Sequence, residues 1–197
     1  MNEFRRYHIA VWIVIASEAL LFSGLFTLYW AYRAEYTAAF RTGVEHDIGW
    51  IGALNTFILL TSSFTIAYAI HAMRTARVRT AGWCLVATLA LGAGFLVFKL
   101  LEWSMHIHEG IVPGIYFYSG PAAGRGITLF FTLYYLMTGL HALHVIAGLG
   151  LVLWVTLRVR NRSIYPERYV ALELVALYWH FVDVVWVFLW PMFYLMR

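Results

Sequence analysis

Residues 9–32 read IAVWIVIASEALLFSGLFTLYWAY, an apolar run in which Glu18 is the single acidic or basic side chain. A helix needs about 20 mostly apolar residues to cross the hydrocarbon core of a bilayer. The apolar part of a secretory signal peptide has only about 7–15 residues and ends at small residues. This run is longer and is followed by Arg33, so we interpret it as a retained membrane-spanning helix.

Four further apolar runs of similar length follow, and the whole chain of 197 residues is 62% hydrophobic and 12% charged. Soluble domains contain about 25% charged residues, so a soluble domain is excluded. Backbone groups in lipid must be hydrogen-bonded internally, which leaves helices or closed barrels, and runs without alternation favour helices. The sequence therefore predicts an all-α membrane protein, a single domain over residues 1–197 with five transmembrane helices in a bundle. Their predicted ranges are about 8–33, 50–73, 81–103, 126–157 and 170–196.

The arginines predict how this bundle is oriented. Most of them lie before the first helix, between the second and third, and between the fourth and fifth. These are Arg5, Arg6, Arg74, Arg77, Arg79, Arg158, Arg160, Arg162 and Arg168. Because segments rich in Lys and Arg stay on the cytoplasmic side, the N-terminus is predicted in the cytoplasm and the C-terminus outside. The net charge of +4 is thus explained by topology, and no nucleic-acid partner is expected.

Three ionisable side chains are predicted at the same depth. With a rise of 1.5 Å per residue, Glu18, His144 and His180 each lie roughly 15–20 Å from the cytoplasmic edge of their helices. An isolated charge at this depth costs about 2.5–3.5 kcal/mol on insertion scales. We therefore hypothesise that Glu18 forms a hydrogen bond with a histidine of the fourth or fifth helix.

Two further sets of polar residues share helix faces. Glu173, His180 and Asp183 form one stripe of the last helix, which we expect to face protein rather than lipid. Lys99 and Glu102 are three residues apart near the outer end of the third helix, where we expect a local pair with a snorkelling lysine.

The remaining histidines raise the question of metal or haem. His141 and His144 are three residues apart, and His180 is on the next helix, but we expect buried carboxylates and hydroxyls to bind these histidines. His106 and His108 are expected in a hydrated loop, because residues 104–125 are predicted to lie along the outer interface. The only cysteine, Cys84, excludes an internal disulfide, a c-type haem attachment and a two-cysteine copper site.

Several stretches resemble subunit III of the haem–copper terminal oxidases. The segment YWHFVDVVWVFLW (178–190) resembles the family signature, and TGLHALHVIAG (138–148) resembles its second strong motif. The family's helix with a buried glutamate is similar to ASEALLFSGLF (16–26), and Glu173 lies where the family carries a glutamate. The segments FKLLEW (98–103) and FTLYYLMTG (131–139) also fit, so the resemblance covers nearly the whole chain.

This resemblance implies an accessory subunit without haem or copper, in the five-helix bacterial form. Such a subunit packs beside the catalytic subunit I, binds phospholipid, and supports proton uptake and stability during oxygen reduction to water. The haems and copper then belong to partner subunits. The location implied is the bacterial cytoplasmic (inner) membrane, and the partners are subunit I, other oxidase subunits and membrane lipids.

Other functions remain open at the level of sequence. The same fold suits an accessory protein of a quinol oxidase or of a nitric oxide reductase, and the electron donor is not encoded in this chain. A di-haem cytochrome b would use His141, His144 and His180 as axial ligands. A transporter is disfavoured because the four prolines lie away from the middle of the predicted helices.

Overall fold

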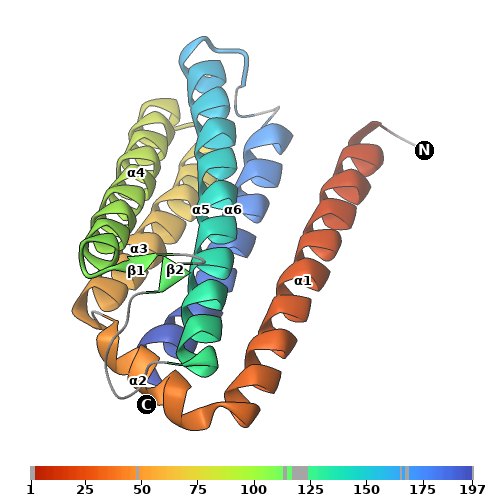
Figure 1. Cartoon of the computed structure of the whole chain (residues 1–197). Helices are drawn as coiled ribbons and strands as arrows, with labels where there is room; N and C mark the ends of the chain where they lie inside the picture. Colours follow the sequence, from red (N-terminus) through yellow and green to blue (C-terminus); the bar gives the residue numbers. More distant parts are fainter. Residues whose placement is uncertain are drawn as a thin grey trace.

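The fold is described from a computed structural model, over residues 3–47, 49–112, 115–116, 124–164, 166 and 169–196. Its long helices are α1 (Glu3–Glu35), α3 (Gly49–Arg74), α4 (Val78–His108), α5 (Arg125–Arg160) and α6 (Val170–Trp190). The short elements are α2 (Thr37–His46), the paired strands β1 (Ile111–Val112) and β2 (Ile115–Tyr116), and a π-helical turn (Pro191–Leu195). Figure 1 shows the long helices as one bundle.

All five long helices are long and apolar enough to cross a membrane, which confirms the predicted five-helix fold. They contain the predicted ranges, except that α6 ends at Trp190 and the chain continues as the π-helical turn. The turn begins at Pro191, whose nitrogen has no hydrogen to donate to the preceding helix. The final predicted helix is therefore divided into two elements.

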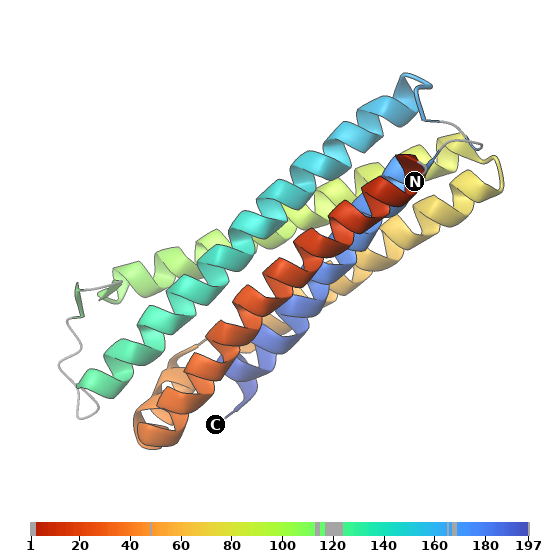
Figure 2. The same ribbon diagram turned by 90° about the vertical axis from the view of Figure 1, so that its right-hand side faces the viewer.

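The arginine-rich segments are predicted to lie on one side of the membrane, and the positions of the helix ends agree with this. The start of α1, the end of α3, the start of α4, the end of α5 and the start of α6 lie at one end of the bundle (Figure 1 and Figure 2). The C-terminus lies at the opposite end. Which of these ends faces the cytoplasm stays a prediction.

Helix α2 lies between the first two predicted membrane-spanning helices, where no helix is predicted from the sequence. It packs against α5 and the π-helical turn at the C-terminal end of the bundle. Phe40 and Val44, one turn apart, are buried there, and Gly43 lies against the ring of Phe130 with no room for a Cβ atom. This packing of its buried face explains why a segment of only ten residues forms a helix.

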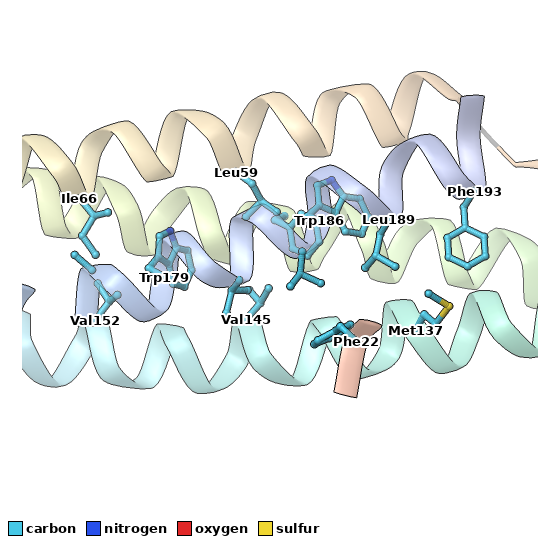
Figure 3. Close-up of a cluster of buried hydrophobic side chains, with 14 of the residues drawn as sticks. Phe22, Leu59, Ile66, Met137, Val145, Val152, Trp179, Trp186, Leu189 and Phe193 are labelled. Carbon is cyan, nitrogen blue, oxygen red and sulfur yellow. The ribbon is translucent and has the colours of Figure 1, made fainter. Parts of the chain in front are cut away.

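The core lies around α6, which packs against α3 and α5. Trp179 and Trp186 are its largest fully buried side chains, and Figure 3 shows them pointing from α6 toward the neighbouring helices. Helix α1 is at the edge of the bundle (Figure 1): only 11% of its most apolar 18-residue stretch is buried, against 50% for that of α6 and the following turn. One helix therefore presents most of its surface to lipid or to another protein.

Candidate functional site

The mid-depth site is a carboxyl–imidazole pair between α1 and α5. Nε2 of His144 lies 2.9 Å from Oε2 of Glu18, as hypothesised from their depths. The side chains are partly exposed, 29% for Glu18 and 14% for His144. The edge of the Phe22 ring packs against the imidazole, with 5.3 Å between the ring centroids. The pair therefore lies at the edge of the bundle, between α1 and α5, rather than in its core.

The hydrogen bonds of His144 limit how this pair can be protonated. Nδ1 lies 2.8 Å from the carbonyl oxygen of Leu140, so Nδ1 must be the donor. A neutral imidazole then has a bare Nε2, which does not bind an ionised carboxylate because both atoms are acceptors. The contact needs one proton, either on Glu18 or as an imidazolium. The arrangement can therefore hold one proton between the carboxyl group of Glu18 and the imidazole of His144.

The polar stripe of α6 faces α3 along its whole length. Glu173 accepts a hydrogen bond from Arg74 at 2.8 Å, in an exposed ion pair at the end of the bundle. Nδ1 of His180 contacts the hydroxyl of Ser63, which also faces the carboxyl group of Asp183. Asp183 is 4% exposed. His180 therefore has a hydroxyl partner and takes no part in binding Glu18.

His141 differs from the expectation that a carboxylate or hydroxyl binds each buried histidine. It is fully buried between aromatic rings, with centroids 5.6 Å from Phe95 and 5.1 Å from Trp186. Neither ring nitrogen has a hydrogen-bond partner within the described ranges. His141 lies about 60° around α5 from His144. The side chain of His141 therefore points into the aromatic core, whereas that of His144 points toward α1. His141, His144 and His180 thus have three separate environments.

Lys99 and Glu102 form a fully buried network, so the predicted snorkelling lysine is wrong. Lys99 is 1% exposed, and its ammonium donates to Glu102 at 3.2 Å and to the hydroxyls of Tyr134 and Tyr194. Both hydroxyls in turn donate to Oε1 of Glu102, at 2.7 and 2.6 Å. The ammonium also lies 5.4 Å from the ring of Trp186. This network joins α4, α5 and the C-terminal turn.

Asp47 and His106 extend the network, which corrects the prediction of a hydrated loop around His106. Helix α4 continues through residues 104–108, and His106 is 1% exposed with Nε2 3.3 Å from Oδ1 of Asp47. A carboxylate oxygen of Asp47, a carboxylate oxygen of Glu102 and a ring nitrogen of His106 all lie within 4.8 Å of one another. Lys99 lies beside Glu102, and His106 lies beside Asp47, so each buried carboxyl group has a basic neighbour.

Part of this network has a signal in the sequence. Glu102 and His106 are four residues apart and must share a face wherever the helix continues that far. Asp47 lies between α2 and α3, outside the helices, and only the fold brings it to the same place. Burial, reinforced by the nearby charge of Glu102, raises the pKa of the Asp47 carboxyl well above its usual range. Asp47 is therefore the group outside the helices whose charge depends most on the fold.

We expect replacement of Asp47 by asparagine to flatten the pH dependence of stability. The folded chain binds the Asp47 proton more tightly than the unfolded chain does. The stability from this proton is complete below the unfolded pKa of about 4 and is lost as the pH rises through the raised folded pKa. Thermal unfolding of the detergent-solubilised chain from about pH 4 upward measures this loss. Parallel wild-type and Asp47→Asn curves across that range would contradict the assignment.

Comparison with known proteins identifies the family. The family model for cytochrome c oxidase subunit III matches residues 4–197. The chain is 33% identical to cytochrome c oxidase subunit 3 of Bacillus sp. strain PS3, over 98% of this chain and 87% of the relative. It is 29% identical to quinol oxidase subunit 3 of Bacillus subtilis strain 168, over 94% of this chain and 84% of the relative.

A third relative is a longer protein, the haem–copper oxidase subunit I+III of Aeropyrum pernix. It is 30% identical over 94% of this chain, which corresponds to 22% of the relative. The match over nearly the full length, together with the five membrane-spanning helices, shows that this chain belongs to the cytochrome c oxidase subunit III family, the third subunits of haem–copper oxidases.

Proposed function

We propose that this chain is a non-catalytic subunit that packs beside the catalytic subunit I of a haem–copper oxidase in the bacterial cytoplasmic membrane. The Aeropyrum relative supports this partner, because its name places subunits I and III in one polypeptide. Because the two subunits are parts of one chain in that relative, they are held close together there. The relatives include both cytochrome c oxidase and quinol oxidase subunits, so either electron donor is compatible with this role.

The observation that carries this proposal is the partly exposed Glu18–His144 pair at the edge of the bundle. Large apolar side chains on the same face of α1 are exposed beside it, among them Val14 and Leu21, at 48% and 46%. A proton-holding pair that faces pure lipid is costly, whereas a pair covered by a neighbouring subunit is protected. We infer that this face of α1 packs against subunit I and that the pair supports proton uptake there.

The same face contains an apolar groove suited to lipid. It has a volume of about 480 Å³ and is lined by side chains of α1, α5 and α6, among them Val14, Ala147 and Tyr178. Val14 is one turn from Glu18, and Ala147 is nearly one turn from His144. We propose that a phospholipid chain fills this groove between the pair and the end of the bundle.

We further propose that the haems and copper of the complex are bound by partner subunits. The three central histidines support this, because each has a separate local environment: His144 contacts Glu18, His180 contacts Ser63, and His141 lies among aromatic rings. Two or more imidazoles around one metal need a common point. An absorption spectrum of the purified chain tests the proposal, and stoichiometric haem in it would refute it.

Isolation of the native complex with a tagged chain tests the proposed partner. We expect mass spectrometry to find a copper-containing oxidase with its subunit I. Recovery of a nitric oxide reductase instead would replace the partner and keep the fold. Cross-links from an introduced residue at Leu21, three residues after Glu18 and on the same face, to subunit I would locate the interface on α1. Cross-links confined to the far side, on α4, would contradict it.

Replacement of Glu18 by alanine is expected to leave assembly partly intact and to shorten the working life of the oxidase during turnover. The change removes the proton that Glu18 and His144 hold together. The measurement is the number of turnovers before the rate of oxygen consumption falls by half. Ser17→Ala is the matched control, because the Ser17 hydroxyl bonds only to the carbonyl of Val14. A wild-type lifetime in Glu18→Ala would contradict the proposed role.

A further inference from the structure

A second groove lies at the arginine-rich end of the bundle, between the start of α4 and the end of α5. Its volume is about 670 Å³. The rim contains Arg79, Arg160 and Arg162, from the first turn of α4, the last turn of α5 and the segment after it. Among the residues that the structure describes, no acidic side chain lines the groove. Three positive charges from three places in the sequence therefore surround one cavity.

Three other arginines of the chain have a partner group, whereas none is found for the rim arginines within the described residues. Arg74 pairs with Glu173, Arg33 donates to the carbonyl of Met196, and Arg158 lies over the ring of Trp154. Within the described residues, none of the three rim guanidinium groups has a carboxylate within 4.0 Å or a side-chain hydrogen bond. Their charge is available to an external anion.

The backbone adds to the positive potential of the rim. Helix α4 begins at Val78, and the preceding Arg77 makes no side-chain capping bond. The N–H groups of the first turn lack acceptors within the helix, and the helix dipole favours a negative charge at this end. Arg162 has φ of +54°, a left-handed conformation that a non-glycine residue rarely adopts.

Deeper in the groove the lining is apolar. Trp83 and Val86 of α4 face Val159 of α5, and Ile164 closes the side. Val86 is seven residues after Arg79, so the apolar wall continues about 10 Å from the rim along α4. A soluble anion matches only the rim, whereas a phospholipid matches both the rim and the wall.

We propose that this groove binds an anionic phospholipid, with its phosphate between Arg79, Arg160 and Arg162 and one acyl chain along Trp83 and Val86. The site is distinct from the groove beside Glu18, because the two share no lining residue: this one lies between α4 and α5, and the other between α5, α1 and α6. It involves only side chains of this chain and does not depend on the identity of the partner subunit.

Native mass spectrometry of the full chain, released from vesicles of phosphatidylglycerol mixed with phosphatidylcholine, tests the site. Two variants remove it in different ways. Arg79→Gln with Arg160→Gln removes rim charge. Gly82→Leu fills the groove and keeps the charge, since a Cβ atom at Gly82 meets nothing within 4 Å. Arg77→Gln is the control for lost charge at the same helix end. Gly94→Leu is the control for added bulk, because Gly94 also has open space and lies outside the groove.

We expect one phosphatidylglycerol to bind the wild-type chain more tightly than phosphatidylcholine does. The arginine double variant should weaken this binding about tenfold or more, given the attraction that each arginine near an anionic lipid contributes. Gly82→Leu should weaken it too, while both controls retain it. The proposal is overturned if the arginine double variant or Gly82→Leu binds like wild type. It is also overturned if Arg77→Gln loses as much, or if millimolar inorganic phosphate displaces the lipid fully.

Discussion

Replacement of Glu102 by leucine is expected to lower the free energy of unfolding by about 3–5 kcal/mol, because it leaves a buried charge without a counterion. Lys99 is 1% exposed, and Glu102 is its only carboxylate partner within 4.0 Å in the part of the chain described. The hydroxyls of Tyr134 and Tyr194 would lose the acceptor that both share. One substitution thus disrupts contacts among α4, α5 and the C-terminal turn.

Unfolding of the detergent-solubilised chain by a denaturing detergent measures this loss. The decisive control is the double variant Lys99→Met with Glu102→Leu, in which no unpaired charge remains. We expect the double variant to recover most of the lost stability, since apolar residues of similar volume often replace a buried pair without loss. If Glu102→Leu alone were within about 1 kcal/mol of wild type, the ion pair would lack the proposed importance.

The position of Lys99 also shows where prediction from the sequence fails. A third helix that ends near residue 103 places Lys99 about one turn from the interface, within reach of water. Helix α4 continues to His108, so Lys99 is nine residues, about 13 Å, from its end. Hydropathy falls at Ser104 and His106 because polar residues appear there, yet these residues are helical and His106 is buried against Asp47. Apolar content therefore underestimates the length of a helix whose end is covered by other parts of the protein.

Contacts that depend only on the depth of two residues along their helices can be predicted from the sequence, whereas contacts that depend on the path of a loop cannot. Glu18 and His144 meet because two long helices cross the same slab, and a fixed rise per residue gives their level. Asp47 meets Glu102 and His106 because α2 folds back beneath the bundle, and no periodicity in the sequence encodes that return. The choice of His144 over His180 also needed the structure, since both have the correct depth.

Replacement of Trp179 by alanine should have the second large effect, with a loss of about 3–5 kcal/mol in the free energy of unfolding. The indole is fully buried and lies between two glycines, Gly92 of α4 and Gly148 of α5. A Cβ atom at either glycine would lie 2.8 Å from the ring. Its Nε1 donates to the hydroxyl of Ser62 on α3, 3.0 Å away. The substitution therefore leaves a cavity where four helices meet.

Two comparisons separate this packing from a general effect of losing tryptophan. Trp83→Ala should change stability little, because that side chain is 75% exposed and sits outside the core. Gly148→Ala should destabilise the wild-type chain, since its new methyl group meets the ring, but should be tolerated beside Trp179→Leu, where the space is free. Residues in contact show such non-additive effects, of about 0.5–3 kcal/mol. If the effects of Gly148→Ala and Trp179→Leu simply add, the indole does not fill the space between the two glycines, and the helices are held together by other contacts.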